Sequence, residues 1–279
     1  MFRSFVAAAL LCAASPLVAQ DGAGSQLPDP NDRSNTFTIA VGAAAVPYYE
    51  GSDDYKLIPA VAIRGRVAGM DFWSSGPKLY LDVFGAPASG IDFDGGPIVG
   101  IRMNRSGKIK DDAVDNLEEL DVAVEVGGFA GVSFHGLTNP YDALNLRVDY
   151  VADVGGAHKS GLVTPSISFS TPLSRRFYVS ASASAEWAGD GYADYYYSIS
   201  PSESVASGLA PYEAEGGLKE WRLGLTALHA FSGDLTHGWS VFASGSYGHL
   251  VGDFADSPIV DDRGSASQWM AATGVAYTF

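Results

Sequence analysis

The sequence predicts an all-β fold, a transmembrane antiparallel β-barrel of about 12 strands, on three observations. The chain ends in a strand that is apolar on one face, it begins with an export signal, and segments of period two recur from Phe37 to the end. A strand with one apolar face needs a protein core or lipid to cover it, and a bilayer admits β-structure only when the sheet closes on itself. We therefore expect the protein in the bacterial cell outer membrane.

The C-terminal segment carries the most specific of these patterns. In residues 269–279 the odd-numbered residues form one mostly apolar face that ends on Phe279. Together with Gly274 and Tyr277, this terminal aromatic residue resembles the assembly signal at the end of bacterial outer-membrane barrels. The resemblance implies that the barrel assembly machinery is a partner of the chain.

The N-terminal segment has the features of a secretory signal peptide over residues 1–19. Arg3 provides a basic start, an apolar run follows from Phe5 to Ala14, and a small-residue cleavage site precedes Gln20. This run is too short for a membrane-spanning helix, which needs about 20 apolar residues. The segment is therefore expected to direct export and to be removed.

The only cysteine, Cys12, lies inside the expected signal peptide, so the exported protein should contain no thiol. This excludes disulfides and cysteine-based metal or nucleophile chemistry. Residues 20–36 are polar and aperiodic and are expected to form a mobile periplasmic leader. The barrel is then expected to occupy residues 37–279.

Alternation of residue types defines the expected strands. In residues 177–187 apolar and aromatic side chains alternate with mostly serine, as in a strand with one face on lipid and the other on a wet lumen. An even count places both termini in the periplasm and the longest gaps outside, which leaves 85–96 as an unusually long periplasmic turn. Residues 192–199 either extend a hairpin or add strands, so ten or fourteen strands stay open. The twelve expected strands are 37–46, 58–67, 69–75, 78–84, 97–104, 121–134, 143–154, 161–171, 177–187, 218–231, 238–248 and 269–279.

The charge balance excludes nucleic acid as a partner. The chain has 17 Lys+Arg against 32 Asp+Glu and a formal net charge of −15, whereas nucleic-acid binding needs clustered positive charge. Within the barrel, like-signed charges would select ions, and mixed signs would pair and plug the lumen. The charged residues expected to line the lumen are Arg64, Arg66, Asp82, Arg102, Arg147, Asp149 and Glu186.

Four motifs occur in order along the chain and resemble those of the MipA/OmpV family, the family of MltA-interacting proteins. The resemblance covers essentially the whole expected barrel. The motifs are Pro47, Tyr49, Glu50, Gly51, Ser52 and Tyr55; Gly95-Gly96-Pro97 with Gly100 and Arg102; Tyr195-Tyr196 through Tyr212 to Gly216-Gly217; and Gly252-Asp253 with Asp256-Ser257-Pro258.

The resemblance implies a barrel without known catalysis. Some members are scaffolds that link a lytic transglycosylase to a penicillin-binding protein. Here such enzymes would bind the mobile leader and the periplasmic turns, chiefly 85–96, 135–142 and 232–237. Other members are porin-like or adhesive surface proteins, so a narrow porin-like channel and an adhesion protein remain alternatives. Conductance across a planar bilayer separates the channel from the scaffold.

The first motif is expected to be an ordered external hairpin. Pro47 ends a strand because it lacks the amide that a ladder needs, and Gly51 permits a tight bend. The tyrosines of the motif are expected at the membrane interface. A ligand contact, made by folding this loop over the mouth of the barrel, is the alternative.

Acidic external loops are the second feature to interpret. Ser257 and Pro258 are flanked by Asp253, Asp256, Asp261 and Asp262, whose oxygens are ligands that calcium or magnesium prefers, but the spacing matches no EF-hand. We expect a solvated surface here and over residues 111–121, where one or two helical turns fit, with no metal site and no cofactor. Contact with lipopolysaccharide through bridging ions is conceivable at such loops.

Catalysis has one candidate constellation. His249 and Ser257 are near enough in sequence for Asp253 to orient the histidine, which are the three roles of a hydrolytic triad. No Gly-x-Ser-x-Gly elbow surrounds Ser257. We therefore expect a protein that is not an enzyme, with outer-membrane lipid hydrolysis as a distant alternative.

Overall fold

The computed structural model describes residues 34–84 and 90–279. The expected signal peptide, and residues 20–33 of the expected leader, lie outside these ranges. Within the described residues the chain forms strands joined by short turns at one end and by longer, partly helical loops at the other. The first strand begins at Thr36, one residue before the expected start of the barrel.

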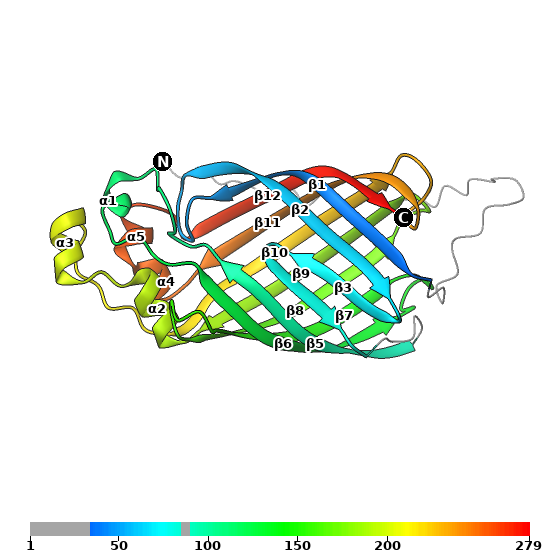
Figure 1. Ribbon diagram of the computed structural model, residues 1–279, viewed down its shortest axis with the longest axis horizontal. Helices are drawn as coiled ribbons and strands as arrows, with labels where there is room; N and C mark the ends of the chain where they lie inside the picture. Colours follow the sequence, from blue (N-terminus) through cyan, green and yellow to red (C-terminus); the bar gives the residue numbers. More distant parts are fainter. Residues whose placement is uncertain (1–33, 85–89) are drawn as a thin grey trace, which may run out of the picture.

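Twelve antiparallel strands close into one barrel, which confirms the predicted fold and strand count (Figure 1). Each strand pairs with its neighbours in sequence, and β1 meets β12 in register from Thr38 opposite Thr278 to Ala45 opposite Ala271. The strands are β1 (Thr36–Pro47), β2 (Tyr55–Val67), β3 (Met70–Ser75), β4 (Lys78–Asp82), β5 (Gly90–Arg102), β6 (Ala123–His135), β7 (Ala143–Asp153), β8 (Gly161–Pro172), β9 (Phe177–Ala188), β10 (Gly217–Ala230), β11 (Gly238–Leu250) and β12 (Ser267–Thr278).

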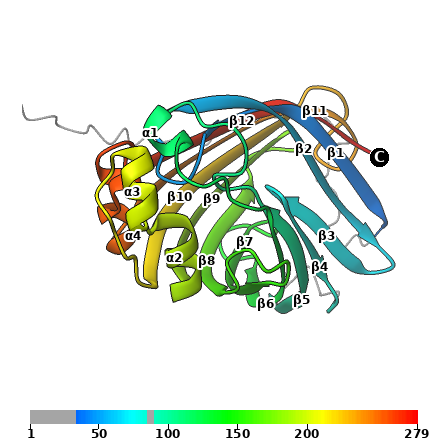
Figure 2. The same ribbon diagram turned by 60° about the vertical axis from the view of Figure 1, so that its left-hand side comes forward.

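The two ends of the barrel differ (Figures 1 and 2). All helices of the described residues lie in connections at one end, and the C-terminus lies at the other, where the turns are short. Bacterial barrels carry short turns on the periplasmic side and long loops outside, so the helical end is external. The helices are α1 (Asp112–Asp115), α2 (Asp190–Tyr197), α3 (Pro201–Ser207), α4 (Asp253–Asp256) and α5 (Pro258–Asp261).

The outer wall of the barrel is apolar between two rows of aromatic residues. Near the external end Tyr247 lies 4.7 Å from Trp269 between ring centroids, and the Trp269 amide donates to the Tyr55 hydroxyl at 3.1 Å. Near the periplasmic end Phe37 stacks on Phe279 at 5.9 Å. Aromatic rows of this kind mark the two membrane interfaces. No helix in the described parts of the chain is long and apolar enough to span a bilayer.

Two local expectations are wrong. Strand β5 begins at Gly90, so most of the expected long turn at 85–96 is strand, and 85–89 lie outside the described residues. Its Asp92 and Asp94 face the lumen, where acidic side chains are tolerated, although they look like turn residues in the sequence. Residues 192–199 add no strand to the barrel, because most of them belong to helix α2.

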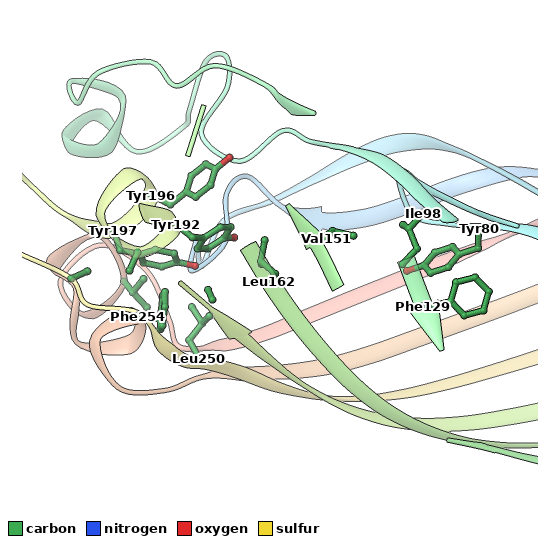
Figure 3. Close-up of a cluster of buried hydrophobic side chains, with 14 residues drawn as sticks. Tyr80, Ile98, Phe129, Val151, Leu162, Tyr192, Tyr196, Tyr197, Leu250 and Phe254 are labelled. Carbon is green, nitrogen blue, oxygen red and sulfur yellow. The ribbon is translucent and has the colours of Figure 1, made fainter. Parts of the chain in front are cut away.

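The buried core of the protein lies at the external end of the barrel. One cluster gathers the α2 tyrosines with Leu250 of β11 and Phe254 of α4 (Figure 3). A second cluster joins the loops above the strands through Tyr49, Val114 and Ile259. The long external loops therefore pack on one another and on the barrel mouth.

Candidate functional site

Helix α2 covers the external mouth with three buried tyrosines. Tyr192, Tyr196 and Tyr197 are 0%, 1% and 1% exposed. The rings of Tyr192 and Tyr196, one helical turn apart, lie 4.7 Å apart, and Tyr197 meets Phe254 edge-on at 5.1 Å (Figure 3). Loop 189–216 therefore folds inward and closes the barrel from outside.

Glu50, from the hairpin between β1 and β2, is the centre of the ion pairs beneath α2. Its carboxylate accepts from Arg102 Nη1 at 2.7 Å and from Lys219 Nζ at 2.8 Å. The hydroxyls of Tyr192 and Tyr197 donate to the same carboxylate at 2.7 and 3.2 Å. Burial would raise the pKa of Glu50, but the charges of Lys219 and Arg102 outweigh it and hold this pKa well below its ordinary value.

The same two cations reach further carboxylates on the barrel wall. Lys219, 1% exposed, lies 2.6 Å from Glu186, and Arg102 Nε donates to Glu125 at 2.6 Å. Glu125 is fully buried and lies 3.6 Å from His158. Buried charges persist only when they are paired, and here opposite signs alternate across the mouth. We call Glu50, Arg102, Glu125, Glu186, Tyr192 and Lys219 the mouth network.

The first sequence motif is part of this closure. Tyr49 is 2% exposed and its hydroxyl donates to the Ile259 carbonyl at 3.2 Å, so this tyrosine lies among the loops and not at the membrane interface as expected. Gly51, with φ of +100°, turns the hairpin inward to a position where a Cβ would lie 2.4 Å from Val260. The Gly51 amide donates to Gln268 at the start of β12.

Other residues of the first motif lie around this contact. Gln268 Nε2 donates to the carbonyl of Ser52 at 3.1 Å. Pro47 is the last residue of β1, and Tyr55 is the first residue of β2 and faces the lipid belt. The hairpin thus folds over the mouth, and hydrogen bonds to Ile259 and Gln268 hold it there.

The fourth motif packs against α2 and builds no triad. Ser257 is buried and donates through Oγ to the Tyr197 carbonyl at 2.7 Å. His249 Nδ1 lies 3.3 Å from Ser267 Oγ instead. Asp253 accepts from the Glu215 amide at 2.9 Å. The three groups that the sequence offered for hydrolysis therefore have separate, structural partners.

The rest of this motif is short helix. Asp256 ends α4 and the buried Pro258 begins α5. No group of three or more His, Asp or Glu side chains suited to a metal ion occurs in residues 34–84 and 90–279. Residues 111–121 contain the single turn α1, where Asp111 caps the helix and pairs with Arg263 at 2.6 Å.

Below the mouth network, Arg147 extends into the lumen among three aromatic rings of the neighbouring strands. Its guanidinium carbon lies 5.7 Å from the ring centroid of Trp73, 5.0 Å from that of Tyr80 and 5.7 Å from that of Phe129. Arg147 Nε lies 2.8 Å from Asp149, which also accepts from the Tyr80 hydroxyl at 3.0 Å. Cation–π contacts and an ion pair hold this arginine in place.

The lumen below Arg147 contains a cavity of about 620 Å³, which Arg64, Asp82 and Asp94 help to line. A second cavity of about 480 Å³ reaches from Arg64 and Ala62 to Leu235 and Thr236 of the periplasmic turn 231–237. Arg66 pairs with Asp71 at 2.7 Å on the same wall. The hollow part of the barrel is therefore its periplasmic half.

Sequence reasoning missed several residues of the site. Lys219, Glu125 and His158 were not among the candidate residues, and the tyrosines of 192–197 were assigned to a possible hairpin. Alternation along β10 would place Lys219 on the lipid face with Trp221 and Leu223, and a register irregularity between Leu218 and Glu220 turns it to Glu186 instead, which no sequence pattern signals. The run Tyr195-Tyr196-Tyr197 is too aromatic for an exposed loop, since large aromatics bury 150–250 Å² each.

The closed barrel, the lipid-facing belt and the mouth network define the class of the protein, an outer-membrane β-barrel whose external mouth is covered by its own loops. A family model described as "MltA-interacting protein MipA" matches residues 39–279. The chain therefore belongs to the MipA family, which confirms the resemblance of the four motifs.

Individual relatives match over a shorter stretch. The MltA-interacting protein of Escherichia coli (strain K12) and that of Shigella flexneri are each 33% identical over 94 residues, which is 34% of this chain and 35% of each relative. The matched part thus spans about a third of the length of these relatives.

Among solved structures, an outer membrane channel of Pseudomonas putida F1 matches with a TM-score of 0.43 and 10% identity, over 92% of this chain and 100% of that one. The outer membrane channel DcaP of Acinetobacter baumannii matches with a TM-score of 0.39 and 10% identity, over 88% and 96%.

Proposed function

We propose that the protein is a non-enzymatic scaffold at the inner face of the outer membrane, where it binds a lytic transglycosylase and a penicillin-binding protein. Membership of a family described as MltA-interacting supports the first partner. The observation that carries the proposal is the closed external mouth, because it leaves the periplasmic end as the accessible end of the lumen.

The mouth network argues for a scaffold over a channel. Conduction needs a continuous path whose sites bind ions weakly enough to release them. Here Lys219 is 1% exposed between Glu50 and Glu186, and Tyr192 is fully buried above them. A passing ion would have to separate these buried pairs, which costs several kcal/mol.

The periplasmic turns form one connected surface suited to a protein partner. Asn139, in the turn 136–142, donates to Thr171 at 2.9 Å beside the turn 173–176. The Leu235 amide, in the turn 231–237, donates to the Arg175 carbonyl at 3.0 Å. These bonds hold three turns against one another, so a partner meets them together.

The chemistry of this surface is apolar with a basic component. Leu137, Leu173 and Phe231 are 54%, 62% and 54% exposed, one in or beside each turn. Arg176 is also exposed, in a chain with a strongly negative net charge. Exposed apolar groups with charges at their rim are typical of protein-binding surfaces, and the partner should present apolar and acidic groups.

Recovery of envelope proteins on the purified barrel tests the proposal. The double variant Leu137→Ser/Leu173→Ser should lose most of the transglycosylase that the wild type recovers. Val205→Ser, at an 88% exposed position of the external helix α3, is the matched control and should recover it normally. A wild-type protein that recovers no transglycosylase would exclude the scaffold, and equal recovery by the double variant would exclude this surface.

A further inference from the structure

On its β3 side, strand β2 has a backbone partner over only part of its length. It pairs with β1 from Pro47 opposite Tyr55 to Thr36 opposite Arg66, but with β3 only from Arg64 to Val67. Within the described residues, no strand pairs with residues 55–62 on the side that faces β3. We call the space beside these residues the β2 gap.

A side chain ends the ladder at the lower border of the gap. The Ile63 amide donates to Ser74 Oγ at 2.9 Å, and this hydroxyl contacts the Ile63 carbonyl at 3.4 Å. Backbone groups alternate sides along a strand, so Val61, Pro59 and Leu57 direct theirs into the gap. Proline has no amide to leave unpaired, and within sheets it is confined to edges and bulges. Pro59 is therefore compatible with the unpaired side of β2.

The gap lies at the depth of the hydrocarbon. Tyr55, at its upper end, belongs to the external aromatic row with Trp269. Phe37, in the periplasmic aromatic row, is opposite Gly65 just below the gap. Unpaired backbone is tolerated at this depth only where it is buried in protein or lines a water-filled cavity. The cavity of about 620 Å³ in the lumen reaches this border, since Ala62, Ile63, Ser74 and Ser75 help to line it.

From Leu57 to Ala62 both faces of β2 are apolar, and Lys56 at the upper end of the gap donates to the Tyr48 carbonyl. Leu57 and Val61 are 78% and 65% exposed on the lipid side. On the lumen side Ile58, Ala60 and Ala62 replace the charges that Arg64 and Arg66 provide further down. Such a wall suits an acyl chain on its inner face as well as its outer face.

One cation marks where a polar headgroup would lie. Arg64 is exposed in the lumen at the last pair of β2 with β3, and no hydrogen bond or ion pair engages its side chain among the described residues. The nearby carboxylates are already partnered. Asp71 pairs with Arg66, Asp82 accepts from two backbone amides, and Asp94 accepts from Ser133 and Asn145.

From this arrangement we infer that the β2 gap is a lateral binding site for an anionic single-chain amphiphile, such as a fatty acid. The carboxylate binds Arg64 in the lumen, and the acyl chain lies along Ile58 and Ala62 and passes between β2 and the β3–β4 hairpin to the bilayer. A cavity of this volume is of the size that holds one small ligand.

Native mass spectrometry of the purified barrel with added palmitate tests the inference. Wild-type protein should bind palmitate and should not bind hexadecanol, which has the same chain without the charge. Arg64→Gln should bind palmitate about tenfold more weakly, as expected for one lost charge-assisted hydrogen bond. Arg64→Lys should keep most of the binding. Arg176→Gln, which removes a charge at the periplasmic rim, should bind like the wild type.

A disulfide that closes the gap reversibly provides a second test of the inference. In the continued register Ala62 would be opposite Ser75, so the pair Ala62→Cys/Ser75→Cys should add a covalent link across the lower border. Palmitate binding should fall on oxidation and return on reduction. Equal binding of palmitate and hexadecanol, unchanged binding by Arg64→Gln, or unchanged binding by the oxidised pair would each overturn the inference.

Discussion

Glu50 and Lys219 are 169 positions apart in the chain, yet the Lys219 ammonium donates to the Glu50 carboxylate at 2.8 Å. The contact joins the first external hairpin to β10 across the mouth of the barrel. It makes the closure of the mouth depend on one buried cation that three carboxylates share.

Replacing this cation should open the mouth. Lys219→Met removes the buried cation between the half-buried carboxylates of Glu50 and Glu186 and leaves them with less positive charge nearby, which is destabilising. We expect lower thermal stability, faster proteolysis of loop 189–216 and a rise in single-channel conductance over the closed wild type. Lys110→Met removes the exposed partner of Asp54 and should leave stability nearly unchanged, because solvent screens this pair. A variant as closed and as stable as the wild type would contradict the role of Lys219.

The closure should weaken in acid. The folded pKa of Glu50 lies below its ordinary value of 4.5, so the carboxylate stabilises the closed loops above that pH, and this contribution is lost progressively as the pH falls below it. Hydrogen exchange in α2 should therefore accelerate below about pH 4.5. Glu50→Gln removes the titrating group, so exchange in that variant should be faster at neutral pH and depend less on pH. An identical pH profile in both proteins would assign the effect to another group.

Barrel closure should be sensitive to volume at the β1–β12 seam. Gly42 and Gly274 are opposite each other there, and a Cβ on Gly42 would lie 2.1 Å from the Thr273 carbonyl oxygen. Gly42→Val should destabilise the barrel by about 1–3 kcal/mol, seen as a lower temperature of conversion on heat-modifiability gels. Gly217, where a Cβ would meet nothing within 4 Å, provides the control Gly217→Ala. Equal conversion temperatures would show that the seam adapts.

The terminal aromatic residue should govern assembly. Phe279 stacks on Phe37, and its amide donates to the Phe37 carbonyl at 2.9 Å, next to the seam. Phe279→Ala should reduce the folded protein in the outer membrane several-fold while export continues. Phe231→Ala changes an exposed phenylalanine at the same end and should assemble normally. Normal membrane levels of Phe279→Ala would exclude the C-terminal segment as an assembly signal.

The barrel was predictable from sequence because each strand faces lipid on one side and the lumen on the other. Apolar and polar residues therefore alternate, and this alternation is visible in a single sequence. Residues 177–187 show it plainly, and β9 has nearly those bounds. β5 was misjudged where Gly95 and Gly96 imitate a turn; both glycines lie in the strand beside closely approaching backbone.

The mouth network was not predictable in the same way. Glu50 belonged to a recognised motif, but its partners Arg102, Tyr192 and Lys219 come from three other segments. Local patterns indicate that a charged residue faces the lumen, but they do not indicate its position along the barrel axis, which decides its partner. Pairing across a barrel depends on register and loop length together, and neither is written in a short stretch of sequence.

The span of the Glu50 contact also bears on the order of events during biogenesis. The hairpin that carries Glu50 is the first to leave the translocation machinery, whereas Lys219 follows more than half of the chain later. The contact can form only after the first hairpin and β10 are both part of the sheet. Until then the external mouth of the barrel is open, so protease resistance of the external loops would report that the barrel is complete.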